Sequence, residues 1–341
     1  MSLVRCEELW GECRILHDSP SISRYYGSIY IPLNLNHGWG IYNLSGHLIN
    51  DTVDFRGTER SPNNQVTEAT INSGHVLNYA DDYHYVYVGR INIHYGHFLI
   101  NTLPRFWAIQ RLRTHRTKIL CHGHGRPEDW FNFPFFAKIC RALGLEPHDF
   151  VMFNAPIRLR EVEIPCTSFE EQYQAHTEYR NFCRFVGERL HASGDSHNND
   201  RPIYFSKAAL TSGVGRIRNE QAFINVIEAA GIDVVAPETL GIEEQIRIFG
   251  TRSLILGTAG SYFHTSIFAP SGSRIVVVNP TIHINSNYSL IDALTGNDAA
   301  YYYPSDLRVV TPSAEDTFLT TREFADPVAA AEQYLAVLGL I

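Results

Sequence analysis

The feature that most constrains the fold is a regular alternation of short apolar runs and amphipathic segments between residues 203 and 278. The segments between the runs have apolar residues at helical spacing, and the first of them stops at Gly231. Short apolar strands that alternate with helices are typical of a parallel sheet covered on both faces, which binds ligands at the carboxyl ends of its strands. The apolar runs that predict the strands are 203–206, 233–236, 254–256 and 274–278.

The third run continues into a glycine turn and a new helix. Gly257 and Gly260 break the strand, helical spacing follows, and Ser261 is placed to cap the helix. Such a turn aims backbone N–H groups and the positive end of a helix dipole at one point, which suits a phosphate. His264 and Thr265 on the first helical turn would point into the same cleft. Glycines also close ordinary turns, so a purely structural interpretation stays open.

A basic loop follows the first of these strands and so begins at the same sheet edge. Residues 206–218 hold Lys207, Arg216 and Arg218. These cations could clamp a diphosphate, with arginine giving bidentate hydrogen bonds. The alternative is a solvated surface loop. Asn219 is expected to cap the next helix.

Two carboxylates near this edge are harder to interpret. Glu220 is expected in the first turn of the helix, where its charge complements the dipole rather than binding a ligand. Glu238 follows the run at 233–236, so it could contact a ribose or be a loop carboxylate without a role.

The residues before 203 form a separate α/β pattern. Strand-like and helix-like segments alternate from 83 to 153, and a long amphipathic helix is predicted over 172–190. The polar stretch 191–202 breaks the periodicity and reads as a linker, which implies a cleft between two domains. We expect three parts: an N-terminal α/β domain over 1–195 with a β-rich start over 1–80, a C-terminal Rossmann-like domain over 196–325, and a helix over 326–341 that packs back on the first domain.

The first domain carries a histidine-rich segment beside a predicted helix. His94 and His97 lead into helical spacing over 98–112, which Pro104 should kink or restart. A histidine at a helix start can hydrogen-bond a sugar, act as a base near neutral pH, or merely cap the helix. Arg105 could bind a ligand anion, or pair with a carboxylate in its own domain.

A zinc site can also be imagined from the histidine pairs. However, His122 and His124 follow a different strand from His94 and His97, and no Cys or carboxylate completes a ligand set. The sequence therefore favours a protein without a metal.

Composition argues against several classes of partner and compartment. The formal net charge is −8 without a long basic run, which argues against nucleic acid binding. No run approaches the roughly 18 apolar residues of a membrane span, and the first residues lack the apolar core of a signal peptide. The six cysteines are scattered without a C-x-x-C pair, as in a reduced cytosolic protein. We expect a cytoplasmic protein, with peripheral contact at the inner face of the membrane left open.

Three blocks of the sequence resemble glycosyltransferase family 61, whose bacterial members include capsular polysaccharide biosynthesis proteins. The first, from Tyr95 to Arg105, reads YGHFLINTLPR and is similar to N-Y-x-H-W-L-x-D-x-L-P-R. The second joins 203–207 to 216–220 and is similar to I-Y-I-S-R followed by R-x-x-N-E. The third joins Pro237-Glu238 and Gln245 to 257–264 and is similar to P-E, Q and G-x-x-G-[AS]-x-[LH].

The resemblance spans roughly residues 84–280 and implies a GT-B fold with the nucleotide sugar on the C-terminal domain. It also implies inverting transfer without an essential metal, in which a helix N-terminus and cations hold the leaving diphosphate. Asn101 stands where the family usually has Asp, Lys207 where it has Arg, and Ala259 where many members have His. Because Asn101 has no usable basicity, His97, one helical turn earlier, is the first choice of base and His94 the reserve.

We therefore predict a glycosyltransferase of surface polysaccharide assembly, with a UDP-sugar as first choice of donor and a glycan or lipid-linked glycan as acceptor. No cofactor is expected. The alternatives are a nucleotide-sugar epimerase of the same architecture, or a non-catalytic sugar- or nucleotide-binding protein, which Asn101 and Ala259 would suit. Arg105 is assigned to the acceptor side, and the predicted donor-binding residues are Lys207, Arg216, Arg218, Asn219, Glu238, Gly257, Gly260, Ser261, His264 and Thr265.

Overall fold

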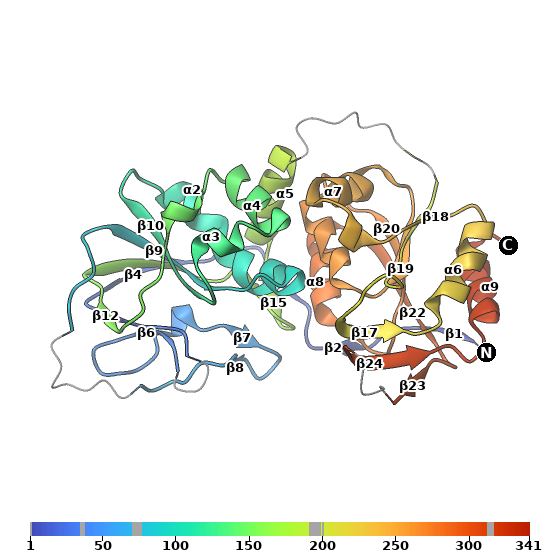
Figure 1. Ribbon diagram of the computed structural model, residues 1–341, viewed down its shortest axis with the longest axis horizontal. Coiled ribbons are helices and arrows are strands. Elements are labelled where there is room, and N and C mark those ends of the chain that lie inside the picture. The colour runs from blue at the N-terminus through green and yellow to red at the C-terminus, as the bar shows by residue number, and fades with distance from the viewer. Residues whose placement is uncertain (1, 35–37, 70–76, 191–198, 200, 312–316) are drawn as a thin grey trace. The chain divides into compact units, whose positions relative to one another are not determined.

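The computed structural model describes residues 2–34, 38–69, 77–190, 199, 201–311 and 317–341 (Figure 1). The chain divides into two compact units, one of residues 11–190 and one that joins residues 1–10 to residues 191–341. Both units mix helices and sheets, which confirms the predicted α/β class. Most of the predicted linker, 191–202, lies outside the described residues.

The unit that contains residues 201–311 is built on a six-stranded sheet. Its strands lie in the order β18, β16, β19, β20, β22 and β1, all parallel except β1. Because β18 lies on one side of β16 and β19 on the other, the chain switches direction between β16 and β19, where open α/β sheets bind ligands. The bounds are Asp233–Val235 (β18), Ile203–Phe205 (β16), Ile255–Thr258 (β19), Arg274–Val278 (β20), Asp298–Pro304 (β22) and Leu3–Arg5 (β1).

Helices cover both faces of this sheet (Figure 1). Tyr204 and Leu256 enter a core with α6 and α9, whereas Phe205 and Ile255 enter a second core with α7 and η6. Neighbouring residues of one strand reach opposite cores because side chains alternate across a strand. The bounds are Glu220–Ala229 (α6), Ile242–Thr251 (α7), Ser261–Phe268 (η6, a 3₁₀ helix), Ser286–Thr295 (α8) and Pro327–Leu338 (α9).

The terminal helix α9 packs within this unit, not back on the first domain as the sequence analysis expected. It contacts α6, and the Tyr334 hydroxyl donates to the carbonyl of Val276 in β20 at 2.6 Å. Asp326 caps the helix by accepting from the backbone N–H of Val328 and Ala329. The apolar face of α9 thus covers one face of the six-stranded sheet of its own unit.

The first ten residues also belong to this unit and not to the start of the first domain. Leu3 pairs with Pro304 in β1, and Leu9 pairs with Ile284 where β2 (Leu9–Trp10) meets β21 (Ile284–Asn285). Pairing between such distant segments leaves no periodicity in the sequence, which explains the error.

Part of the predicted basic loop is a strand. Gly213–Ile217 form β17, which runs parallel to β24 (Phe318–Glu323), and β23 (Arg308–Val310) pairs with β24 on its other side. The glycines and cations of this segment resemble a loop because its partner strand lies about a hundred residues later.

The unit of residues 11–190 has a five-stranded sheet in the order β11, β10, β9, β13 and β4, with β4 as an antiparallel edge. A three-stranded sheet of β12, β5 and β6 covers one face through Tyr30, Ile41, Tyr87 and Leu120. The bounds of these strands are Phe150–Val151 (β11), Thr117–Gly123 (β10), His84–Ile91 (β9), Glu161–Pro165 (β13), Ile22–Tyr26 (β4), Ile157–Arg158 (β12), Ile29–Ile31 (β5) and Gly40–Tyr42 (β6).

Short strands and helices complete this unit. Phe55–Arg56 (β7) and Ser61–Pro62 (β8) form a hairpin. The remaining elements are Arg14–Leu16 (β3), Phe169–Glu170 (β14), Gln174–His176 (β15), Ile109–Leu112 (α2), Pro127–Trp130 (α3), Pro134–Ala142 (α4) and Thr177–Leu190 (α5).

The segment over 95–112 is helical, but its winding changes along its length. One turn of α-helix at Tyr95–His97 (α1) passes into a π-helical turn at Phe98–Thr102 (η2) and then into a 3₁₀ helix at Leu103–Ala108 (η3). Pro104 lies at the start of η3, where its missing N–H costs least, so the predicted restart at this proline is found. π turns within helices often occur at functional sites.

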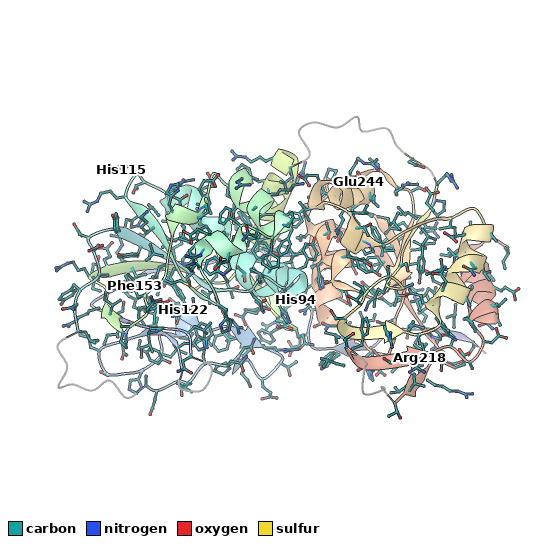
Figure 2. The ribbon with its side chains drawn as sticks, in the orientation of Figure 1. His94, His115, His122, Phe153, Arg218 and Glu244 are labelled. Atoms are coloured by element: carbon teal, nitrogen blue, oxygen red, sulfur yellow. The ribbon has the colours of Figure 1, made fainter. Side chains whose placement is uncertain are left out.

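His122 is a core residue of this unit, not a zinc ligand. Its side chain has no exposed surface, Nε2 donates to the carbonyl of Ile31 at 2.9 Å, and Nδ1 accepts from the Tyr87 hydroxyl at 3.1 Å (Figure 2). Its ring stacks on Tyr30 at 4.2 Å. Burial lowers the pKa of His122 to about 3, so the ring is neutral in the folded protein.

Acidification should therefore destabilise the fold through His122. Unfolding exposes an imidazole that binds a proton below its ordinary pKa of 6.5, whereas the folded ring stays neutral down to about 3. The contribution of His122 to stability is complete above pH 6.5. It is lost as the pH falls from 6.5 towards about 3, by up to about 1.4 kcal/mol per pH unit. We expect His122→Gln to be less stable than wild type near neutral pH but to lose less stability on acidification. Denaturant unfolding at a series of pH values measures this, and equal pH slopes would contradict it.

Candidate functional site

A buried carboxylate joins the two strands at the switch point. Glu220 is 1 % exposed and accepts from the Tyr204 hydroxyl at 3.0 Å, the Thr258 hydroxyl at 2.6 Å and the backbone N–H of Lys207 at 3.1 Å. Burial raises the pKa of Glu220, and these hydrogen bonds oppose that shift. The sequence analysis gave Glu220 only a role towards the helix dipole. In the structure it fixes the carboxyl ends of β16 and β19 and the start of the loop between β16 and β17.

Lys207 places a cation at the same point. Its Nζ donates to the carbonyl of Ala259 at 3.4 Å, across the gap from β16 to the end of β19. Burial lowers the pKa of Lys207, the carboxylates of Glu220 and Glu238 oppose that shift, and the nearby charge of Arg322 adds to it. Glu238 is exposed in the turn after β18, and its charge lies near enough to Lys207 to affect the pKa of that lysine.

Arg322 is a residue that sequence reasoning missed. It lies in β24, where it is the register partner of Ile217, and its carbonyl accepts from the N–H of Arg218 at 2.8 Å. Its charge, like that of Glu238, reaches Lys207. No local signal marked it, because the strand pairing that brings it here was not apparent from the sequence.

The glycine turn is shaped by packing as well as by its backbone. A Cβ on Gly257 would lie 2.6 Å from the carbonyl oxygen of Phe205, and a Cβ on Gly260 would overlap the Tyr262 ring. Gly260 is the residue before the 3₁₀ helix η6, and Ser261 is the first residue inside it, so Ser261 does not cap the helix as predicted. The first N–H groups of η6 still have no acceptor within the helix, as at any helix start.

Two predicted donor-binding side chains are turned into the protein. Thr265 is fully buried, and its hydroxyl donates to Gln245 Oε1 at 3.2 Å. His264 is 6 % exposed, and its ring stacks on Tyr288 of α8 at 4.9 Å. Neither points into open space as predicted, because the 3₁₀ winding packs this face of η6 against α7 and α8.

The polar residues of β17 and of the segment just after it make different contacts. Arg216 lies over the Phe318 ring at 4.9 Å, whereas Arg218 is exposed (Figure 2). Asn219 precedes α6 but does not cap it with its side chain; instead its amide exchanges two hydrogen bonds with the backbone of Phe324. Asn219 therefore anchors the chain at the end of β24.

The histidine segment of the unit of residues 11–190 forms a connected polar chain. His97 Nδ1 lies 3.0 Å from Asn101 Oδ1, and Asn101 Nδ2 donates to Glu171 Oε2 at 3.2 Å. Arg56 Nε lies 3.3 Å from the other Glu171 oxygen. Glu171 was missed by sequence reasoning, since it lies 70 residues from Asn101.

His94 precedes α1 and is exposed, and its ring lies 5.2 Å from that of His97 (Figure 2). Partial burial and the neighbouring His97 lower the pKa of His94. The structure thus brings the two histidines together at the start of the helical segment.

Arg105 has a structural role in place of the predicted anion-binding one. It is 1 % exposed, and its terminal nitrogens donate to the carbonyls of Asp51, Val53 and Pro165. Asp54 lies 3.8 Å away, which agrees with the alternative of a carboxylate partner within the unit.

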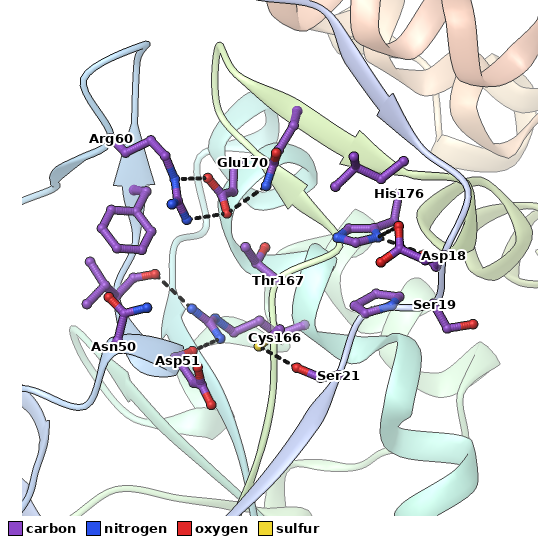
Figure 3. Close-up of a pocket in the computed structure, with 16 residues that line it drawn as sticks. Asp18, Ser19, Ser21, Asn50, Asp51, Arg60, Cys166, Thr167, Glu170 and His176 are labelled. Atoms are coloured by element: carbon purple, nitrogen blue, oxygen red, sulfur yellow. Dashed lines mark hydrogen bonds and ion pairs between the residues drawn. The ribbon is translucent and has the colours of Figure 1, made fainter.

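A polar pocket of about 340 Å³ lies in the same unit, among β3, β14 and β15 (Figure 3). Arg60 donates to both oxygens of Glu170 at 2.9 and 3.0 Å, and Gln174 donates to Glu170 at 3.2 Å. His176 Nδ1 donates to the carbonyl of Asp18 at 2.8 Å. These groups satisfy one another, so the pocket gives no clear indication of a ligand.

The comparison with protein families decides between the enzyme classes. The glycosyltransferase 61 family matches residues 95–276, more than half of the 341 residues. The chain belongs to glycosyltransferase family 61. A comparison with curated proteins gave no match.

The family identity makes the protein a glycosyltransferase with a donor and an acceptor substrate. The matched range begins at Tyr95, next to His94, and includes Lys207 and the glycine turn of this glycosyltransferase. Arg322 lies beyond it. Among the described residues, no helix has the length and hydrophobicity that a membrane span requires. Across the same parts of the chain, no group of three or more His, Cys, Asp or Glu side chains is arranged to hold a metal ion.

Glu220→Gln tests the connection at the switch point. The amide can still accept from Tyr204 and Thr258, but its NH₂ would then face the N–H of Lys207, so one buried donor is left unsatisfied. We expect a loss of about 1–3 kcal/mol in unfolding free energy. Glu228→Gln, an exposed glutamate at the other end of α6, is the control and should change little. Equal stability of both variants in denaturant unfolding would argue against the connection.

Proposed function

We propose that this glycosyltransferase takes a nucleotide sugar, with a UDP-sugar as first choice, and transfers the sugar with inversion to a glycan or lipid-linked glycan. The observation that carries the proposal is the desolvated cation at the switch point, where Lys207 meets the end of β19. A diphosphate there would neutralise Lys207 and the nearby Arg322 at once. The exposed Arg218 and the N–H groups at Gly260 and Ser261 are the further proposed donor contacts.

The proposed chemistry uses no metal ion. As the bond from the sugar to phosphate breaks, negative charge develops on the leaving diphosphate. Fixed cations and the positive end of a helix can stabilise that charge, as Mg²⁺ does elsewhere. Lys207, Arg322 and η6 are the groups proposed for this task.

We infer a GT-B arrangement in which the unit that joins residues 1–10 to residues 191–341 binds the donor and the unit of residues 11–190 provides the acceptor side. A separate parallel sheet in each unit supports this. The proposed role in surface polysaccharide assembly, in the cytoplasm or at the inner face of the membrane, rests on the family resemblance.

His97 is the proposed general base, with His94 in reserve. Inversion requires a group that takes the proton of the acceptor hydroxyl as that oxygen attacks the anomeric carbon. His97 has one ring nitrogen engaged by Asn101, which fixes the ring and leaves the other nitrogen for a substrate.

Donor binding tests the role of Lys207. We expect Lys207→Ala to weaken UDP binding in EDTA by about 1.5–3 kcal/mol, the range for a hydrogen bond to a charged group. Because the pKa of Lys207 is lowered, wild-type affinity should fall as the pH rises through it, earlier than for an exposed lysine. Lys207→Arg should keep the affinity and remove this alkaline loss, since arginine stays charged.

Arg274→Ala is the control for that experiment. Arg274 is an exposed cation at the amino end of β20, at the opposite edge of the same sheet, so its loss should leave UDP binding unchanged. Calorimetry measures all four proteins. Binding that disappears in EDTA and returns with Mn²⁺ would contradict the metal-free proposal.

Turnover tests His97. We expect His97→Ala to lower kcat about 10²–10⁴-fold while UDP affinity stays nearly unchanged, because a base acts on the acceptor proton and not on the donor. His115→Ala, an exposed histidine of the same unit, should behave as wild type (Figure 2).

Released nucleoside diphosphate, measured over a panel of nucleotide sugars with and without glycan acceptors, is the assay. Wild-type turnover in His97→Ala would remove it from this role.

A further inference from the structure

The hydrogen bonds of Asn101 determine which way its amide faces. A carboxylate only accepts hydrogen bonds, so the Asn101 group 3.2 Å from Glu171 Oε2 must be the NH₂. The amide oxygen therefore faces His97 Nδ1 at 3.0 Å. An amide oxygen only accepts, so His97 must carry its proton on Nδ1.

The proton on Nδ1 has a consequence for the other nitrogen. A neutral imidazole has one protonated nitrogen and one bare nitrogen. With Nδ1 protonated and held by Asn101, Nε2 is bare and can accept a proton. The tautomer required of a general base through Nε2 is thus selected by a carboxylate that does not touch the histidine.

We propose that Glu171 is a positioning residue that acts through Asn101 on His97, in place of the aspartate that the family usually has at position 101. The inference rests on the proposed role of His97 as base. Glu171 orients the amide, the amide holds the Nδ1 proton, and the negative charge of Glu171 stabilises the imidazolium that forms. A side-chain amide orients a catalytic histidine in the same way in Cys-His-Asn proteases.

The proton and bond balance of the step is complete. The acceptor O–H bond breaks as its proton moves to His97 Nε2, and the oxygen forms the new bond to the anomeric carbon. The bond from that carbon to the phosphate oxygen breaks, and the diphosphate leaves with the electron pair. Throughout the step Nδ1 of His97 keeps its proton and donates it in a hydrogen bond to the Asn101 oxygen. His97 later returns the Nε2 proton to water.

The neighbouring glutamate gives a matched control. Glu170 and Glu171 are consecutive and buried, and each pairs with an arginine of the β7–β8 hairpin segment, Arg60 and Arg56 respectively. Only Glu171 contacts Asn101. Glu170 makes more side-chain hydrogen bonds than Glu171, two with Arg60 and one with Gln174, so a purely structural role would make the Glu170 variant at least as damaging as the Glu171 variant.

Steady-state turnover tests the proposal. We expect Glu171→Gln to lower kcat about 10–100-fold, by analogy with outer partners that orient metal-binding histidines, with the donor KM unchanged. Glu170→Gln should keep kcat within a few-fold of wild type.

A double variant tests whether the charge can be moved along the chain of hydrogen bonds. Adding Asn101→Asp to Glu171→Gln should restore most of kcat. The new amide at position 171 can then donate to the new carboxylate at position 101, which accepts from His97 and returns the negative charge to the chain. Equal losses of kcat in Glu170→Gln and Glu171→Gln would overturn the proposal. No recovery of kcat in the double variant would overturn it as well.

Nitrogen NMR of the imidazole tests the tautomer without turnover. The His97 signals are identified by their absence in His97→Ala. Wild type and Glu170→Gln should show a protonated Nδ1 and a bare Nε2, whereas Asn101→Leu should show both tautomers. A protonated Nε2 in neutral wild type would overturn the relay. Wild-type turnover in His97→Ala, with the tautomer as expected, would instead overturn the proposed base and leave the orientation of His97 standing.

Discussion

The site region of the sheet depends on one buried carboxylate. Glu220 accepts hydrogen bonds from a side chain of β16, a side chain of β19 and the N–H of Lys207 in the loop after β16. At a switch point the connections that follow two neighbouring strands leave in opposite directions, and this carboxylate gives the two strand ends a shared partner. Burying a carboxylate costs free energy unless it is hydrogen-bonded, so breaking any of the three hydrogen bonds is unfavourable and all three partners stay in place. The position of Lys207 follows from that arrangement.

Several polar residues of the family motifs bind backbone groups of the fold and do not face open space where a substrate could bind. Arg105 donates to three carbonyls, Asn219 binds the backbone of Phe324, and Gln245 donates to the carbonyl of Pro237. In each case a strong donor satisfies groups that the sheets and helices leave unpaired. A motif in a sequence therefore identifies the neighbourhood of a site more reliably than the individual contacts within it.

The parts of the fold that could be predicted were those with a local signal. The strands at 203–205 and 274–278 and the helix after Asn219 follow from apolar periodicity. Arg322 and Glu171 could not be predicted, because each reaches the site through pairing or hydrogen bonding with residues far away in sequence. The capping role of Ser261 failed for a different reason: the helix already begins at Ser261, so Gly260 occupies the cap position, and it is wound as a 3₁₀ helix that packs against α7 and α8.

The pairing of β1 with β22 has a consequence for the order of folding. Leu3 is synthesised before its partner Pro304, which follows about three hundred residues later. Residues 11–190 are synthesised in between and can form their own core before β1 has a strand to pair with. Contacts of such separation close slowly, so the pairing of β1 with β22 should be the last edge of the sheet to form. Until then β22 presents an open edge, and a short N-terminal strand is what finally covers it.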